Sequence, residues 1–170
     1  QMGVLTPNRS IPCSGAYYYR GGKIKCHHHP PPISVSQALQ YSCNTYFITV
    51  LRDAVDKYGF TRPSKGLAEL DRHLYDFGLG HPLGADMMHE TRGNIPTPEY
   101  YEKIYGKGWR STYMMFIGIG QGEIQMSTLQ IANLAAIIAN RGFYYVPHLI
   151  KGFKNKKVLI PPTFREKHYS

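Results

Sequence analysis

A stripe of apolar residues begins after Ser34 and continues, at steps of three and four residues, as far as Tyr58. This spacing is typical of an α-helix that buries one face. Ser34 or Ser36 offers a cap for its start, and Gly59 offers a flexible residue that ends it. Ser42 interrupts the stripe, so the pattern predicts one long helix or two helices that meet near this residue. The apolar positions are Val35, Ala38, Leu39, Cys43, Tyr46, Phe47, Val50, Leu51, Ala54, Val55 and Tyr58.

Two further helices are predicted downstream. The first has one apolar face and ends near Gly78; its face consists of Leu67, Leu70, Leu74 and Phe77. Prolines and glycines then predict an irregular segment over residues 79–112. Ser127 and Gln130 have the spacing of a capping box, which opens a helix that runs to about Asn140. This helix lacks a polar face and is expected to be buried, and residues 143–153 are predicted to form a strand.

The chain therefore divides into three stretches of different character. Residues 1–33 are rich in proline and glycine and are expected to form loops that something else must hold in place. Residues 34–142 are helical, and residues 143–170 combine a short strand with a basic tail. The predicted fold class is mainly α with minor β, within one domain.

Composition and charge narrow the class of protein. The 170 residues are 42% hydrophobic and 18% charged, which excludes a disordered chain or a coiled coil. The longest apolar run, residues 134–139, is far shorter than the ~20 residues of a membrane span, and no signal peptide is recognisable at the start. The net charge of +9 is scattered except at the basic end of the chain. This favours a solvated basic face, with a weak preference for anionic polymer or lipid headgroups as the alternative, and argues against a nucleic-acid partner.

Ser42 and Asn44 are the first candidates for chemistry. A hydroxyl within an apolar stripe needs a partner, and one interpretation is a serine that bonds back to the carbonyl four residues earlier. The other is a hydroxyl and a carboxamide, two positions apart, that both face a cleft where a helix begins.

A second group of candidates is formed by cysteines and histidines in or beside the loop-rich stretch. Cys13, Cys26, His29 and Cys43 have the spacing C-x12-C-x2-H-x13-C, and three thiolates with one imidazole satisfy a tetrahedral structural zinc. His29 is preferred over its neighbour His27 as the fourth ligand. A Cys13–Cys26 disulfide with Cys43 buried as a small core residue, or three free thiols, are the alternatives.

Two other features have a structural and a functional interpretation. The run GIGQGE lacks the lysine of a phosphate-binding loop, which favours a tight turn that lets the following helix pack close. Aromatic residues in the middle of the chain either pack together or line a groove for peptide or glycan; they are Tyr100, Tyr101, Tyr105, Trp109 and Tyr113.

Several runs of the sequence resemble class B penicillin-binding proteins of the elongation type, the penicillin-binding protein 2 kind. ALQYSCNTYF resembles the second active-site motif, S-x-N, and FIGIGQGEIQMSTLQIANLAAIIANRG is similar to a stretch downstream of it. GVLTPNRSIPCSG, FGLGHPLGADMMHETRGNIPTPEYY and VPHLIKG are also similar, so the resemblance covers nearly the whole chain. It implies the helical part of the penicillin-binding, serine transpeptidase α/β fold, in truncated form.

The resemblance also implies a function. Family members cross-link peptidoglycan stem peptides through a serine acyl-enzyme and bind β-lactams. By family role, Ser42 relays a proton and Asn44 holds the donor's amide carbonyl. No serine here begins S-x-x-K and no lysine begins K-T-G, so this piece is expected to be inactive alone.

The expected setting is the periplasmic face of the inner membrane, through an anchor outside this chain. The expected partners are a glycosyltransferase and elongation-complex proteins. The alternatives are a zinc-stapled, non-catalytic interaction module and a basic cell-wall-binding domain.

Overall fold

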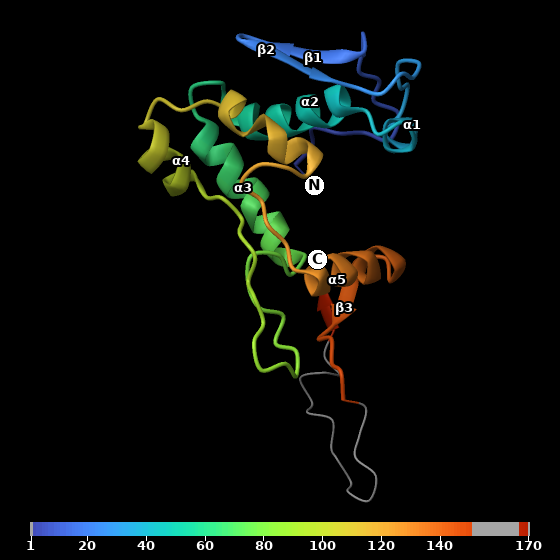
Figure 1. Ribbon diagram of the computed structural model, residues 1–170, viewed down its shortest axis with the longest axis vertical. Coiled ribbons are helices and arrows are strands. Elements are labelled where there is room, and N and C mark those ends of the chain that lie inside the picture. Colours follow the sequence, from blue (N-terminus) through green and yellow to red (C-terminus); the bar gives the residue numbers. More distant parts are fainter. Residues whose placement is uncertain (1, 151–166, 170) are drawn as a thin grey trace, which may run out of the picture. The chain divides into compact units, whose positions relative to one another are not determined.

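The computed structural model describes residues 2–150 and 167–169, whose regular elements are mostly helices, with two short two-stranded antiparallel sheets (Figure 1). This confirms the predicted fold class of mainly α with minor β. The elements are β1 (Ala16–Tyr19), β2 (Gly22–Lys25), α1 (Val35–Gln40), α2 (Asn44–Val55), η1 (Asp56–Tyr58), α3 (Pro63–Asp76), α4 (Pro98–Tyr105), η2 (Ser111–Ile119), α5 (Thr128–Ala139), β3 (Phe143–Tyr145) and β4 (Lys167–Tyr169). The chain divides into two compact units, one from residues 1–70 and 96–123, the other from residues 71–95 and 124–170. Among the described residues, no helix has the length and apolarity needed to cross a membrane.

The first unit is built around α2. The 3-10 helix η2, golden in Figure 1, packs against α2, and the β1–β2 hairpin contacts the same helix. One core cluster joins α2 to the other helices of the unit and consists of Leu51, Val55, Leu67, Tyr101, Trp109 and Met114. A second cluster lies where the N-terminal segment meets α1 and α2 and consists of Ile11, Cys13, Ala38, Cys43 and Tyr46. The stripe predicted from the sequence therefore contributes residues to both clusters.

The stripe forms two helices rather than one. The Ser34 hydroxyl accepts a hydrogen bond from the backbone N–H of Gln37, which caps the start of α1 as predicted. The chain then leaves helical geometry, because Ser42 has φ 48° and Cys43 is extended before α2 begins. Gly59, with φ 105°, follows η1 and ends the helical run.

The loop-rich segment 1–33 contains one short hairpin. β1 and β2 pair in antiparallel register from Ala16 opposite Lys25 to Tyr19 opposite Gly22, and Arg20 and Gly21 form the turn. Gly21 has φ 102°, which a side chain would strain. The pairing orders only eight residues, so most of the segment remains loop, as expected.

The prediction of an irregular segment over residues 79–112 misses α4. The prolines of this segment suggested a break, yet Pro98 occupies the first turn of α4, where no intrahelical bond is lost. The Thr97 hydroxyl caps this turn by accepting a hydrogen bond from the N–H of Tyr100. Proline therefore marks the start of this helix.

In the second unit, α5 has the capping box that the sequence predicts. Ser127 and Gln130 satisfy each other's backbone N–H groups, and Asn140 ends the helix. The expectation of a buried helix is wrong here, since Ile131 is 52% and Ile138 is 71% exposed. The described residues cover only one side of α5, because its other apolar side has no facing element among them.

The predicted strand at residues 143–153 is shorter than expected. β3 covers Phe143–Tyr145 and pairs with β4 in antiparallel register. Residues 151–153 and most of the basic tail lie outside the described residues.

Candidate functional site

Ser42 and Asn44 line the same open pocket of about 400 Å³ in the first unit. Leu39 and Phe47 give the pocket an apolar lining, and the chain at Gly118 lines it as well. The structure thus brings the two candidate polar residues together at the junction of α1 and α2. This agrees with the interpretation that both face a cleft.

Ser42 is exposed, which corrects the expectation that it lies within a buried stripe. Its positive φ turns the residue out of the helical path, and a left-handed conformation is uncommon and costly for a serine. Only its backbone N–H bonds back, to the carbonyl of Leu39 at 3.1 Å. Within residues 2–150 and 167–169 the hydroxyl makes no hydrogen bond, so it is available to a ligand in the pocket.

Asn44 is the first residue of α2, and its side chain is half-buried. Its Nδ2 donates a hydrogen bond of 2.8 Å to the backbone carbonyl of Lys25 at the end of β2. This contact joins the pocket to the hairpin and leaves the amide oxygen as an acceptor.

Gly118, Ile119 and Gly120 of the run GIGQGE also line the pocket, although the sequence did not assign this run to a site. A Cβ on Gly118 would lie 2.9 Å from the Phe47 carbonyl oxygen and 3.1 Å from the Cα of Ile48, so η2 approaches α2 closely here. Gly120, with φ 72°, then turns the chain away. The motif therefore permits close packing as predicted, but against the preceding helix α2 rather than the following helix. The density of glycines in GIGQGE was the available signal.

The cysteine and histidine candidates converge on Cys43, which lies in the chain between the pocket residues Ser42 and Asn44. Cys13, Cys26, His29 and Cys43 place one ligand atom each within 4.8 Å of one another. The Cys13 and Cys26 sulfurs are 3.5 Å apart, and the Cys13 sulfur is 4.0 Å from Nε2 of His29. Sulfurs bound to one tetrahedral zinc lie ~3.8 Å apart, given Zn–S bonds of about 2.3 Å. These distances fit a metal site, and all three cysteines are free rather than disulfide-bonded.

Polar partners orient this group. Nδ1 of His29 lies 2.7 Å from the Pro30 carbonyl oxygen. When Nδ1–H donates a hydrogen bond to that oxygen, Nε2 is unprotonated and directs its lone pair toward the sulfurs. Thr45 was missed by the sequence interpretation; its hydroxyl lies 3.5 Å from the Cys13 sulfur and 3.3 Å from the Cys26 sulfur. The backbone N–H of Thr45, in the first turn of α2, also donates to the Cys26 sulfur. His27 is exposed and outside the group.

The surroundings give the thiols different acidities. Burial raises the pKa of Cys43 to about 12, and the neighbouring Cys13 and Cys26 add to this. Burial also opposes ionisation of Cys13, yet hydrogen bonds from Thr45 and the Gly15 backbone bring its pKa below the usual value. The hydrogen bond to Pro30 raises the pKa of His29. Three thiolates so close together need a cation to offset their mutual repulsion.

The aromatic residues in the middle of the chain form a stacked row. Trp109 is fully buried and stacks on Tyr101 with ring centroids 4.9 Å apart. Tyr101 stacks on Tyr105, and Tyr105 stacks on Tyr113 at 4.5 Å. The packing interpretation therefore holds for Tyr101 and Trp109, which are fully buried. Tyr105 and Tyr113 form the exposed end of the row, at 44% and 49% exposure.

Comparisons with known proteins agree on one family. The model of the family described as penicillin binding protein transpeptidase domain matches residues 1–169. The peptidoglycan D,D-transpeptidase MrdA of Haemophilus influenzae is 32% identical over 158 residues, which cover 89% of this chain and 22% of that protein. The chain thus spans about a fifth of the length of this relative.

Solved structures show the same similarity. Pseudomonas aeruginosa PBP2, in complex with WCK 5153, is 26% identical with a TM-score of 0.69, covering 98% of this chain and 35% of that one. A chain of a peptidoglycan synthase complex is 25% identical with a TM-score of 0.71, covering 88% of this chain and 24% of that one.

Proposed function

The chain belongs to the penicillin-binding protein transpeptidase domain family, and we propose that it forms the internal, helical part of a peptidoglycan D,D-transpeptidase of the elongation type. In this proposal the whole protein cross-links stem peptides through a serine acyl-enzyme and is acylated by β-lactams. The reactive serine, in S-x-x-K, and the K-T-G strand come from other parts of the protein, since neither motif occurs in these 170 residues.

The observation that carries the proposal is the pair Ser42 and Asn44 on the wall of one open pocket. Ser42 relays a proton between the catalytic lysine and the leaving amine; its exposed hydroxyl supports this role. Asn44 holds the donor's amide carbonyl; one N–H of its Nδ2 donates to the Lys25 carbonyl, and the second N–H is the donor for the substrate. Neither residue is the nucleophile. Ser42 transfers a proton and Asn44 orients the substrate, which are the roles of groups that assist an activated serine.

Acylation of the full-length protein by a fluorescent penicillin tests the proposal. Ser42→Ala and Asn44→Ala are expected to lower the acylation rate constant by about 10²-fold or more, the scale of proton-transfer catalysis. Ser36→Ala, an exposed serine on α1 outside the pocket, is the matched control and should acylate normally. The 170-residue chain alone should show no labelling. Absence of labelling in the unaltered full-length protein overturns the proposal.

We also propose that Cys13, Cys26, His29 and Cys43 hold a structural zinc. Support comes from the ligand atoms, which lie within 4.8 Å of one another, and from a donor set that suits tetrahedral Zn²⁺. The ion would fasten the loop-rich segment to the junction of α1 and α2. One zinc per chain by elemental analysis, reduced by Cys26→Ser, is the expected result. A metal-free protein that reacts with three equivalents of a thiol reagent contradicts it.

The cysteine and histidine group also favours a second candidate, a zinc-stapled interaction module without catalysis. The two candidates differ in penicillin labelling, because a module binds zinc without being acylated. A basic cell-wall-binding domain is the remaining alternative, and it would bind isolated cell wall in a salt-dependent manner without labelling.

For the cellular setting, we propose the periplasmic face of the inner membrane, with an anchor outside this chain. A glycosyltransferase and other elongation proteins are the proposed partners. Support for assembly comes from the peptidoglycan synthase complex among the similar structures. Co-purification of the full-length protein with a membrane glycosyltransferase tests this partner.

A further inference from the structure

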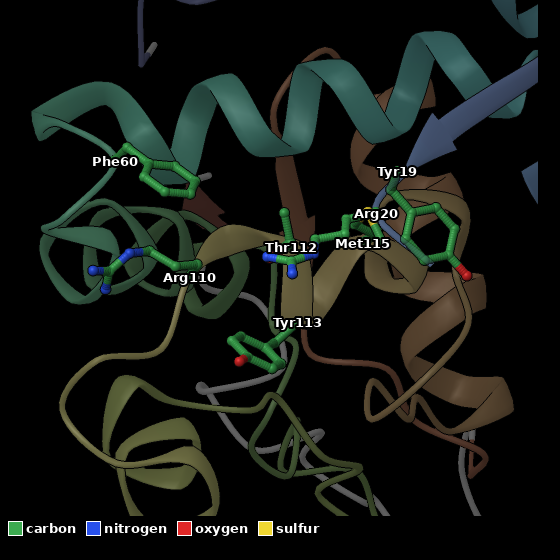
Figure 2. Close-up of a pocket in the computed structure, with 7 residues that line it drawn as sticks. All are labelled: Tyr19, Arg20, Phe60, Arg110, Thr112, Tyr113 and Met115. Atoms are coloured by element: carbon green, nitrogen blue, oxygen red, sulfur yellow. The ribbon is translucent and has the colours of Figure 1, made fainter. Parts of the chain in front are cut away.

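A second pocket, of about 560 Å³, lies in the first unit and shares no lining residue with the Ser42 pocket. Three segments enclose it: the β1–β2 turn with Tyr19 and Arg20, the residue Phe60 after η1, and the start of η2. Figure 2 shows Phe60 and Arg110 on one side of the pocket, Tyr19 on the opposite side and Tyr113 below. Its volume is in the range of pockets that bury small organic ligands.

The pocket carries two positive charges that no carboxylate neutralises directly. Neither Arg20 nor Arg110 forms an ion pair within the part of the chain that the structure describes. Asp56, whose charge interacts with Arg110, accepts a hydrogen bond of 2.7 Å from Ser111 and forms an ion pair with Arg52 at 3.8 Å. Asp56, the acid whose charge interacts with that of Arg110, is therefore already bound to Ser111 and Arg52.

Arg110 is held in position while most of its donors stay available. Its Nη1 donates to the carbonyls of Gly108 at 2.6 Å and Trp109 at 2.9 Å, and its guanidinium carbon lies 5.4 Å from the centre of the Phe60 ring. A guanidinium has five N–H donors, so Nη2 and Nε remain for a ligand. Such a fork matches a carboxylate in a bidentate geometry.

Aromatic rings supply the apolar sides of the pocket. Tyr113 is fixed by stacking on Tyr105, yet half of its surface is exposed. Phe60 is also 50% exposed, and buried Met115 lies in the lining. Fixed rings beside cationic forks suit a ligand that combines carboxylates with flat amide groups and short aliphatic parts.

We propose that this pocket binds a peptidoglycan stem peptide through its free carboxylates, as a second site separate from the Ser42 pocket. This inference rests on the proposed function for the substrate class. Stem peptides carry several carboxylates on a short chain of amides, which fits two arginines flanked by rings. The site would hold a neighbouring strand while the donor peptide occupies the pocket of Ser42 and Asn44.

The test is calorimetric titration of the full-length protein with the soluble peptide L-Ala-D-Glu-diaminopimelate. Arg20→Gln and Arg110→Gln are each expected to weaken binding about tenfold, the effect of losing one charge-assisted contact. Arg72→Gln, an exposed arginine of α3 outside the pocket, is the matched control. The same peptide with amidated carboxylates should bind the unaltered protein no more tightly than the unmodified peptide binds the double variant, which carries both Arg20→Gln and Arg110→Gln.

Three results overturn the inference: equal peptide affinity in the double variant, equal affinity for the amidated peptide, or displacement of the peptide by an equal concentration of inorganic phosphate. Penicillin acylation is measured in parallel and should be unchanged in the arginine variants. If the unaltered protein is not acylated by penicillin, the proposed function fails. The peptide titration does not depend on acylation, so it tests the second site separately.

Discussion

The side-chain amide of Asn44 donates to the backbone carbonyl of Lys25, the residue immediately before Cys26. This hydrogen bond of 2.8 Å adds to the contacts that Thr45 makes with the Cys26 sulfur, so the first turn of α2 is connected to the cysteine–histidine group at two residues. Cys43 lies between Ser42 and Asn44 and reaches the same group. Any change that releases Cys26 therefore alters the support of the Ser42 pocket.

This connection predicts that Cys26→Ser lowers penicillin acylation of the full-length protein, although Cys26 does not line the pocket. We expect loss of zinc and a decrease of about tenfold in the acylation rate constant, the effect typical of residues that orient a site indirectly. Melting temperature is recorded at the same time to identify simple unfolding. Lost zinc with normal acylation would separate the metal from the pocket.

Comparing Ser42→Gly with Ser42→Ala should separate an effect on stability from an effect on acylation. Glycine adopts φ 48° without strain, so the variant should unfold with a free energy about 1 kcal/mol higher than Ser42→Ala. Both variants lack the hydroxyl and should share the same acylation defect. Chemical denaturation and penicillin labelling of the pair measure the two quantities, and equal stability would argue against the left-handed conformation.

Gly66→Ala is expected to destabilise the first unit. A Cβ at Gly66 would overlap the Val55 carbonyl oxygen, so α3 must move away from the end of α2. The cost should be at least ~1–3 kcal/mol, the usual effect of overpacking, despite alanine's higher helix propensity. At Gly108 a Cβ meets nothing within 4 Å, so Gly108→Ala is the control and should be nearly neutral in denaturant unfolding.

Gln130→Glu tests whether the side chain of Gln130 holds the loop at residues 78–95 in the second unit. The fully buried Gln130 donates through Nε2 to the carbonyls of His81 and Arg92, each at 3.0 Å. A carboxylate cannot donate and would be buried among carbonyl oxygens, so the loss should be at least ~3 kcal/mol. Hydrogen exchange over residues 78–95 should increase. The exposed Gln121→Glu is the control, and similar exchange in both variants would refute the assignment.

Asp56 predicts a pH dependence of stability. Burial raises the pKa of its carboxyl above the usual 3.8, against the hydrogen bond from Ser111 and the charge of Arg52. The folded state therefore binds this proton more tightly than the unfolded state. Its stabilising contribution is fully present below pH 3.8 and is lost as the pH rises through the raised pKa.

Asp56→Asn should remove that decline, so its unfolding free energy should vary less with pH than that of the unaltered protein from pH 3.8 upward. The exposed Asp76→Asn, at the end of α3, should retain the decline. Denaturant titrations across this range provide the measurement, and parallel pH profiles for all three proteins would contradict the prediction.

The sequence alone determined the features that depend on neighbouring residues. The apolar stripe predicted the helices on either side of Ser42, and the spacing of Ser127 and Gln130 predicted the cap of α5, because helix periodicity and capping act within a few residues. The resemblance of several runs to one family also indicated the family, and it predicts Ser42 and Asn44 as site residues.

Tertiary structure decided which distant residues meet. The left-handed turn at Ser42 exposes a hydroxyl that the stripe had placed inside, and Gly118 closes its pocket from a segment more than seventy residues later. The choice between exposed and buried faces of α5 likewise depends on what packs beside it. Such contacts arise from chain folding over long separations, and no local pattern of side chains encodes them.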